Sequence, residues 1–514
     1  MDLGREGGID AVWAQGWRLI QSNFPMRIPY PERIPYSWAT VVAGALFAII
    51  VWQGTAVEWA ICFFCFFMLA VTGVNLGGGM YRPVGAYICF NAVLTLILGV
   101  VGKIVLREPA DSNLLAPMHL IEVYMVGMAS ICFAALIDYL FRPRRSLLTR
   151  WFPVVSLRKM YIGVLVVGIG MNLYWMSDPV IAPGTFTSAL RYTDELLPFG
   201  VVLGVMYTVR TSNGKRSMNF LLLFVITLMT LEGLLLYSKQ GLFMGTFAWV
   251  LGVGLTRFRL KAIHLITLGV VGFLMVHYAV TVVQAGKNLD RGTHPIENIA
   301  PTWDMLMRTS ELRQQNEPDG IGDRQDVQYY NQEEGLLDRL QMVGIDDLLI
   351  AETDRDGFIG YGPMEQGWVS IVPHVIWKDK PNAYYGNYYA HQLDLLADGD
   401  DTTGVSFSPS ADAYKQGGFF GGIVVMETTC LSIVFLMFSI IAGDVRDHPV
   451  AMVLVLSVAH VAPEGAVAGA INQLLFAVAI LGIGFFARFV TPILTSAVTP
   501  PEKLENGALM SLLD

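Results

Sequence analysis

The chain has 514 residues and a formal net charge of -9 at pH 7, with 15% charged and 54% hydrophobic residues. A soluble fold of this length would have too few polar residues to cover its surface, so the composition excludes an ordinary soluble protein. Repeated apolar stretches of about 20 residues, each able to cross a ~30 Å hydrocarbon core, instead predict an all-α polytopic membrane protein.

The N-terminal segment, residues 1–37, has no basic region followed by an apolar core and a small-residue cleavage site. We therefore expect no cleaved signal peptide. Beyond it, the apolar pattern predicts about twelve transmembrane helices, about nine within residues 38–284 and about three within residues 416–494. The predicted spans are 38–54, 56–76, 83–102, 117–141, 160–177, 196–209, 218–237, 241–256, 263–284, 418–441, 450–469 and 472–494.

Basic residues gather in three of the connections between these spans, and all three connections fall on the same side of the membrane if the count is right. The positive-inside rule assigns this side to the cytoplasm, together with residues 1–37 and the C-terminal tail, 495–514. The basic residues are Arg142, Arg144, Arg145, Arg150, Arg158, Lys159, Arg210, Lys215, Arg216, Arg257, Arg259 and Lys261.

A large hydrophilic loop, residues 285–415, then lies on the exocytoplasmic face. It holds 23 Asp plus Glu against 10 Lys plus Arg. Within it, residues 286–335 are polar and contain three prolines, whereas 336–353 has apolar residues at near-helical spacing and predicts an amphipathic helix. Connections of this length are uncommon and usually functional, so we expect the loop to carry the chemistry.

Cations that interrupt the acidic loop are the first candidates for a functional site. His374, Lys378 and Lys380 lie within seven residues of each other in the run IVPHVIWKDKP, 371–381, and Arg339 lies in the predicted amphipathic helix. Such a cluster indicates an anion site. The alternative is that the two lysines are solvated surface residues and that His374 is a packed histidine.

Two further cations lie in short outer connections of the predicted topology. Lys239 separates two apolar spans. A cation so close to the hydrocarbon region is costly unless it has a charged partner or a functional role. Alternatively, a lysine at a helix end can extend its amine to the membrane interface. Arg191 occupies the preceding outer connection. It is either a second anion ligand or an interfacial anchor beside Tyr192.

Acidic patterns allow two other interpretations. Asp354-Arg355-Asp356 and Asp398-Gly399-Asp400 spell D-x-D, a pattern that holds a metal and nucleotide in sugar-nucleotide transferases. An outer loop meets no nucleotide sugar, so we expect no metal role. Three acidic residues lie in or at the ends of apolar spans: Glu232, Glu427 and Asp138. If they formed a proton relay, they would indicate a transporter.

Two runs resemble motifs of a known family, the Wzy-type bacterial polysaccharide repeat-unit polymerases. IVPHVIWKDKP is similar to the family's proline-basic-x-x-tryptophan-x-x-lysine-proline pattern. SFSPSADAYKQGGFFGGI, 406–423, is similar to its acidic-x-tyrosine-x-x-glycine approach to the next span. The resemblance covers roughly Lys239 to Ile423. The family often has Arg in place of His374 and Glu in place of Asp412.

This resemblance implies a GT-C-like bundle in the bacterial inner membrane that joins undecaprenyl-diphosphate-linked repeat units by inverting, metal-independent glycosyl transfer. Lys239, Arg339, Lys378 and Lys380, with Arg191, would hold the diphosphate. His374 or Asp412 would accept the proton of the attacking hydroxyl, and Trp377 and Tyr414 would contact sugar rings. No cofactor and no nucleic acid are implied. Besides membrane lipid, the expected partners are a chain-length regulator and a flippase of the same pathway.

Two rival functions remain open at this point. An O-antigen ligase would share the donor and a similar bundle but would transfer finished glycan to a lipid core. A lipid-linked oligosaccharide flippase or another transporter would depend on ionisable residues inside the bundle, and the large outer loop argues against it.

Overall fold

The structure is a computed structural model, and the regular secondary structure of its described residues is helical apart from two isolated β-bridges. This agrees with the predicted all-α class. The described residues are 26–154, 156–177, 190–286, 297–315, 328–331, 341–372, 377, 385–396, 399 and 404–495.

Within these residues, 6 helical stretches are long and apolar enough to cross a membrane. They are Val57–Leu76, Pro83–Leu106, Pro117–Phe141, Ala262–Gly286, Pro409–Ile441 and Ala466–Leu494. Three shorter apolar helices accompany them, Tyr36–Trp52, Phe220–Leu235 and Ala451–Glu464. The protein is therefore an α-helical protein with several candidate membrane spans.

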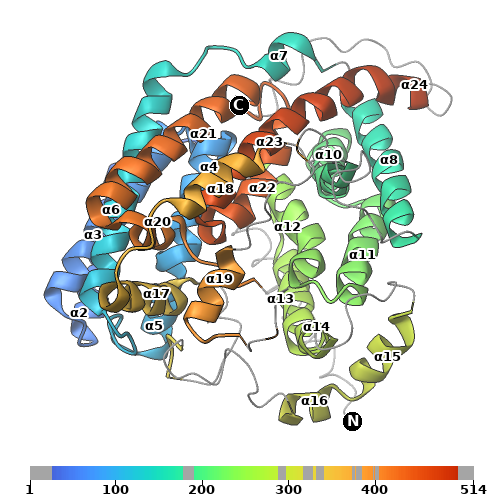
Figure 1. Ribbon diagram of the computed structural model, residues 1–514. Helices are drawn as coiled ribbons and strands as arrows, with labels where there is room; N and C mark the ends of the chain where they lie inside the picture. Colours follow the sequence, from blue (N-terminus) through green and yellow to red (C-terminus); the bar gives the residue numbers. More distant parts are fainter. Residues whose placement is uncertain are drawn as a thin grey trace, which may run out of the picture.

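The first helices of the chain form a group on the left of Figure 1, where α3 packs on α6 and α6 packs on α21. A proline starts both α4 and α6, a position that suits it because the first helical N–H groups have no partner within the helix. The group contains α2 (Tyr36–Trp52), α3 (Val57–Leu76), α4 (Pro83–Ala92), α5 (Leu98–Leu106), α6 (Pro117–Phe141) and α21 (Thr428–Ile441).

A second group lies on the right of Figure 1, where α10 packs on α8 and α12, and α11 packs on α12. Gly233 allows the last pair to touch, since a Cβ there would overlap the backbone of Leu242. The group contains α8 (Leu157–Ser177), α10 (Leu196–Thr211), α11 (Phe220–Leu235), α12 (Lys239–Leu255), α13 (Ala262–Leu274) and α14 (Val280–Gly286).

Helix α22 joins the two groups, because it packs on α4 of the first and α10 of the second. The next helix, α23, packs on α21 and continues through a π-helical turn to α24, which packs on α8. The bounds of these helices are α22 (Ala451–Glu464), α23 (Ala466–Phe485) and α24 (Thr491–Thr495).

Short helices form the described part of residues 285–415. Helices α15, α16, α17 and α19 lie at the end of the molecule opposite α7 (Leu147–Trp151), as Figure 1 shows. The short helices pack on different parts of the bundle: α15 on α11, α17 on α6 and α20, and α18 on α23. Their bounds are α15 (Ile299–Met307), α16 (Thr309–Gln315), α17 (Val343–Asp356), α18 (Gly362–Ser370), α19 (Tyr385–Gln392) and α20 (Pro409–Gly417).

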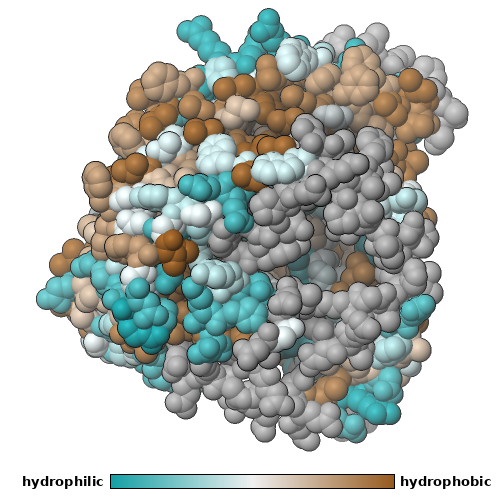
Figure 2. Space-filling view, viewed as in Figure 1, coloured by the Kyte–Doolittle hydropathy of each residue, from teal (hydrophilic) through white to brown (hydrophobic). Residues whose placement is uncertain are grey.

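Hydropathy separates this end from the rest of the visible face. Hydrophilic residues gather over α17 and α19, and a hydrophobic band covers the helices above them (Figure 2).

Several predicted boundaries differ from the structure, and two of them concern the loop 285–415. The predicted helix 336–353 is observed as α17, which begins at Val343 because Met342 N–H donates to Thr95 O (3.3 Å) and the Gln341 side chain caps the first turn. The span predicted to start at residue 418 is part of a helical stretch that starts at Pro409. Ser408 caps this start by accepting a hydrogen bond from Ala411 N–H (3.2 Å).

Candidate functional site

Helix α20 carries the second of the two sequence motifs and lies where several helices meet. It packs on α6, α17 and α23. Gly127 of α6 makes the first contact possible, because a Cβ there would overlap the side chain of Ser410. The Ser410 hydroxyl in turn donates to Glu427 Oε1 at 2.9 Å. These contacts fix the position of α20 against the bundle.

Asp412 lies inside this packing and is only 1% exposed. Its carboxylate accepts three hydrogen bonds, from Tyr389 Oη (2.7 Å), Gln416 Nε2 (3.0 Å) and the backbone N–H of Val467 (2.9 Å). Asp412 thus ties α19 and α23 to α20. To accept a proton from a substrate hydroxyl, as the sequence analysis expects, it would first have to be uncovered.

Asp346 anchors α17 in a similar way from the other side of α20. It is fully buried, and its carboxylate accepts from Ser408 N–H (3.0 Å) and from Tyr124 Oη (2.8 Å). Burial raises its pKa to about 7, against the lowering effect of these hydrogen bonds. The neighbouring Asp347 accepts from the backbone N–H groups of Leu115 and Ala116, and burial raises its pKa to about 6.

These raised pKa values predict a pH-dependent stability. A carboxyl group whose pKa is higher in the folded state contributes most below its unfolded value, and the contribution is lost as the pH rises through the folded value. For Asp346 this loss falls between about pH 4 and pH 7. We expect the free energy of unfolding to be higher at pH 5 than at pH 8 by up to about 3 kcal/mol.

Thermal unfolding of the detergent-solubilised protein, followed by tryptophan fluorescence at both pH values, measures this difference. Asp346→Asn should reduce it, since the amide stays neutral and can still bond to Ser408 N–H and Tyr124. An equal pH dependence in this variant would contradict the assignment to Asp346.

A second cluster includes Tyr414 of α20 together with residues of α6 and α17, and it is partly open to solvent. His119, in the first turn of α6, contacts Asp354 of α17 through Nδ1 and Oδ2 at 2.5 Å. Tyr414 Oη donates to Asp354 Oδ1 at 2.7 Å and lies 3.4 Å from His119 Nε2. The side chains of His119 and Asp354 are 36% and 33% exposed, whereas Tyr414 is buried. We call these three residues the His–Asp–Tyr cluster.

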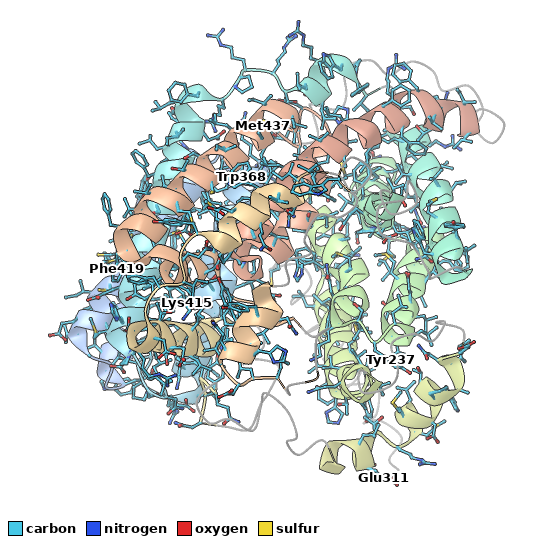
Figure 3. The ribbon with its side chains drawn as sticks, in the orientation of Figure 1. Tyr237, Glu311, Trp368, Lys415, Phe419 and Met437 are labelled. Carbon is cyan, nitrogen blue, oxygen red and sulfur yellow. The ribbon has the colours of Figure 1, made fainter. Side chains whose placement is uncertain are left out.

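Aromatic rings surround the His–Asp–Tyr cluster. Phe419 lies 5.5 Å from His119 and 5.1 Å from Tyr414 between ring centroids, and Phe358 lies 5.9 Å from Tyr414. Phe358 is 59% exposed and Tyr361 is 42% exposed. Gly418 has φ +68° and leaves room for the Phe358 ring. Figure 3 shows Phe419 and Lys415 on this side of the molecule. Exposed rings beside titratable groups could bind the flat face of a sugar.

Lys239 lies on the other side of the molecule. It is the first residue of α12, and Ser238 caps the helix by accepting from Gly241 N–H (3.1 Å). The turn between α11 and α12 is covered by α15, where Thr302 Oγ1 lies 3.2 Å from Tyr237 Oη. Tyr237 marks this turn in Figure 3, well apart from Lys415. The structure thus confirms the short turn and places part of the loop on it.

A buried cation holds another part of the loop. Lys103 is 0% exposed, and its Nζ donates to Glu108 Oε2 (2.8 Å) and to Ser112 Oγ (2.9 Å). The amine also lies 4.7 Å from the ring centroid of Tyr329, whose hydroxyl donates to Ala110 O (2.6 Å). We call this set, with Tyr330 (5.9 Å from the amine), the Lys103 clamp. It attaches residues 328–331 to the end of α5.

Several predicted site residues lie outside the described residues, namely Arg339, His374, Lys378 and Lys380. Arg191 has a described backbone, in the short segment Leu190–Glu195 before α10, but its side chain is not described. Trp377 is described and is 44% exposed. The structure therefore brings Asp412 and Tyr414 together on α20 and places Lys239 elsewhere.

Comparisons with protein-family models, curated proteins and solved structures found no match for this chain.

Sequence reasoning missed His119 and treated Asp354 only as part of a D-x-D pattern. A signal for His119 was present, because a histidine at the end of an apolar span is a functional candidate by default. Nothing in the sequence paired it with Asp354, which follows 235 positions later. In the described part of the chain, no three His, Cys, Asp or Glu residues are grouped so as to hold a metal ion.

Proposed function

We propose that the protein is a membrane glycosyltransferase that joins undecaprenyl-diphosphate-linked repeat units into a polysaccharide at the outer face of the bacterial inner membrane. The reaction is inverting and needs no metal. In this proposal about twelve helices span the membrane, both termini are cytoplasmic, and residues 285–415 lie outside.

The main structural support for the proposal is the position of the motif helix α20. The motif helix α20 begins the stretch Pro409–Ile441, which is apolar enough to span a membrane, and its Tyr414 belongs to the partly exposed His–Asp–Tyr cluster. A substrate with a polyprenyl tail and a polar head needs this arrangement, with reacting groups beside an apolar surface. The position of α17 and α19 opposite α7, whose flanking segments are basic, supports the proposed orientation (Figure 1).

The chemistry requires two kinds of group. The diphosphate gains negative charge as its bond to C1 of the sugar breaks, and preplaced cations stabilise that charge. Lys239, Arg339, Lys378 and Lys380, with Arg191, are proposed for this task. The attacking hydroxyl must also lose a proton to a positioned base.

Two measurements test the function. Purified protein in liposomes should elongate lipid-linked repeat units without any nucleotide sugar, and a deletion strain should retain single repeats but lose long chains. Accumulation of full-length lipid-linked polymer in the deletion strain would indicate a ligase. Movement of the lipid-linked units across the bilayer without elongation would indicate a transporter, and either outcome would overturn the proposal.

A further inference from the structure

We propose that His119, oriented by Asp354, is the group that accepts the proton of the attacking sugar hydroxyl. The inference rests on the proposed function and assigns the base of that reaction to the first turn of α6. The family resemblance instead implied His374 of the loop motif or Asp412 of α20 as this base.

Hydrogen bonding in the His–Asp–Tyr cluster selects the tautomer that a base requires. A carboxylate only accepts hydrogen bonds, so the 2.5 Å contact is made by a hydrogen on His119 Nδ1. A neutral imidazole with its hydrogen on Nδ1 has a free lone pair on Nε2. The Tyr414 hydroxyl has a single hydrogen and gives it to Asp354 at 2.7 Å, so it leaves that lone pair unprotonated.

The proposed step moves one proton to His119 and exchanges one bond at C1 of the donor sugar for another. The acceptor hydroxyl gives its proton to His119 Nε2, and its oxygen forms the new bond to C1 of the donor sugar. The C1–oxygen bond of the donor breaks, and undecaprenyl diphosphate leaves with the electron pair. The resulting imidazolium is stabilised by the Asp354 carboxylate, and its new Nε2–H faces the Tyr414 oxygen, 3.4 Å away.

Accessibility distinguishes His119 from Asp412. The His119 side chain is 36% exposed, and the exposed rings of Phe358 and Tyr361 lie nearby on the segment after α17. Asp412 is 1% exposed, and three donors occupy its oxygens. The ring of His119 is therefore partly open to solvent, whereas Asp412 is enclosed by the core.

The charged and titratable groups around His119 come from three elements. Asp354 faces it from α17 and Tyr414 from α20, and Glu122 lies one turn along α6, close enough to act electrostatically on Tyr414. Of these groups, the Asp354 carboxylate lies directly against the imidazole ring.

His119→Gln tests the inference in the liposome elongation assay. We expect the elongation rate at saturating substrate to fall about 100-fold or more, with the KM for the lipid-linked repeat unit changed little. The residual rate should rise with pH over a range in which the wild-type rate is level, because hydroxide replaces the missing base. Asp354→Asn should also lower the elongation rate, since it removes the carboxylate that keeps the His119 hydrogen on Nδ1.

His460→Gln is the matched control. His460 also pairs with a carboxylate, Glu464, at 3.6 Å and is partly exposed. This variant should elongate at the wild-type rate, and the thermal unfolding temperatures of all variants should remain close to that of the wild type.

Each contrary outcome has a distinct meaning. A wild-type rate in His119→Gln would overturn the inference and leave the proposed function standing. If the elongation rate falls together with the unfolding temperature, and the pH profile of the rate is unchanged, His119 has a structural role. This outcome would also overturn the inference. Wild-type protein that binds the lipid-linked units but does not elongate them would overturn the proposed function and the inference with it.

Discussion

Asp412→Ala is expected to destabilise the folded protein by at least about 3 kcal/mol. The substitution removes the acceptor of three buried donors, and each unsatisfied buried donor costs about 1–3 kcal/mol. Helices α19 and α23 would lose their shared attachment to α20. We expect a lower thermal unfolding temperature in detergent and less folded protein in the membrane.

Asp304→Ala is the control for this experiment. Asp304 pairs with Arg308 at 3.2 Å on the surface of α15, where both side chains are more than half exposed. An exposed pair of this kind contributes about 0–1 kcal/mol. Wild-type stability in Asp412→Ala would contradict the anchoring role. Under the proposed function, lost polymer in this variant would reflect lost structure rather than lost catalysis.

Lys103→Met is expected to cost about 3–5 kcal/mol, because it leaves Glu108 buried without its partner. The clamp would also lose the cation beneath the Tyr329 ring. Residues 328–331 should therefore detach from α5 before the bundle unfolds. Limited proteolysis near these residues, together with thermal unfolding, measures both effects.

The double variant Lys103→Met with Glu108→Gln separates charge from packing. Removing both charges should restore part of the lost stability, since no unpaired ion remains. Arg308→Met, which breaks the exposed pair with Asp304, should change stability by about 1 kcal/mol or less. Equal losses of stability in Lys103→Met and Arg308→Met would contradict the stabilising role of the buried Lys103–Glu108 pair.

Apolar length and composition predicted the helical class well, because every backbone polar group in a hydrocarbon layer must bond within its own helix. The boundaries were less accurate. Ser408 and Pro409 start a helix ahead of the predicted span. The polar residues that follow them did not suggest that this helix continues into the apolar span, as it does in the stretch Pro409–Ile441. Serine is favoured at helix N-caps, so Ser408 could have been used to predict this helix start.

The site was harder to predict than the fold. Asp412 and Tyr414 were found through a motif, but their surroundings depend on partners far away in the sequence. Val467 N–H bonds to Asp412, and His119 lies against Tyr414. No local pattern contains such pairs, because they arise only when α6, α20 and α23 pack together. The roles of Arg339, His374, Lys378 and Lys380 stay predictions.

The placement of α18 has a consequence for how the protein is made. Gly367 lies against Ala468, Ser370 bonds to Asn472, and Phe407 pairs with Gly465. All three partners lie within or next to the first two turns of α23, so the ribosome synthesises these segments before the surface on which they rest. These segments must wait, already translocated in the proposed topology, until the last helices are inserted. A chain truncated before Gly465 should therefore leave α18 undocked, because α23 is the helix on which it packs.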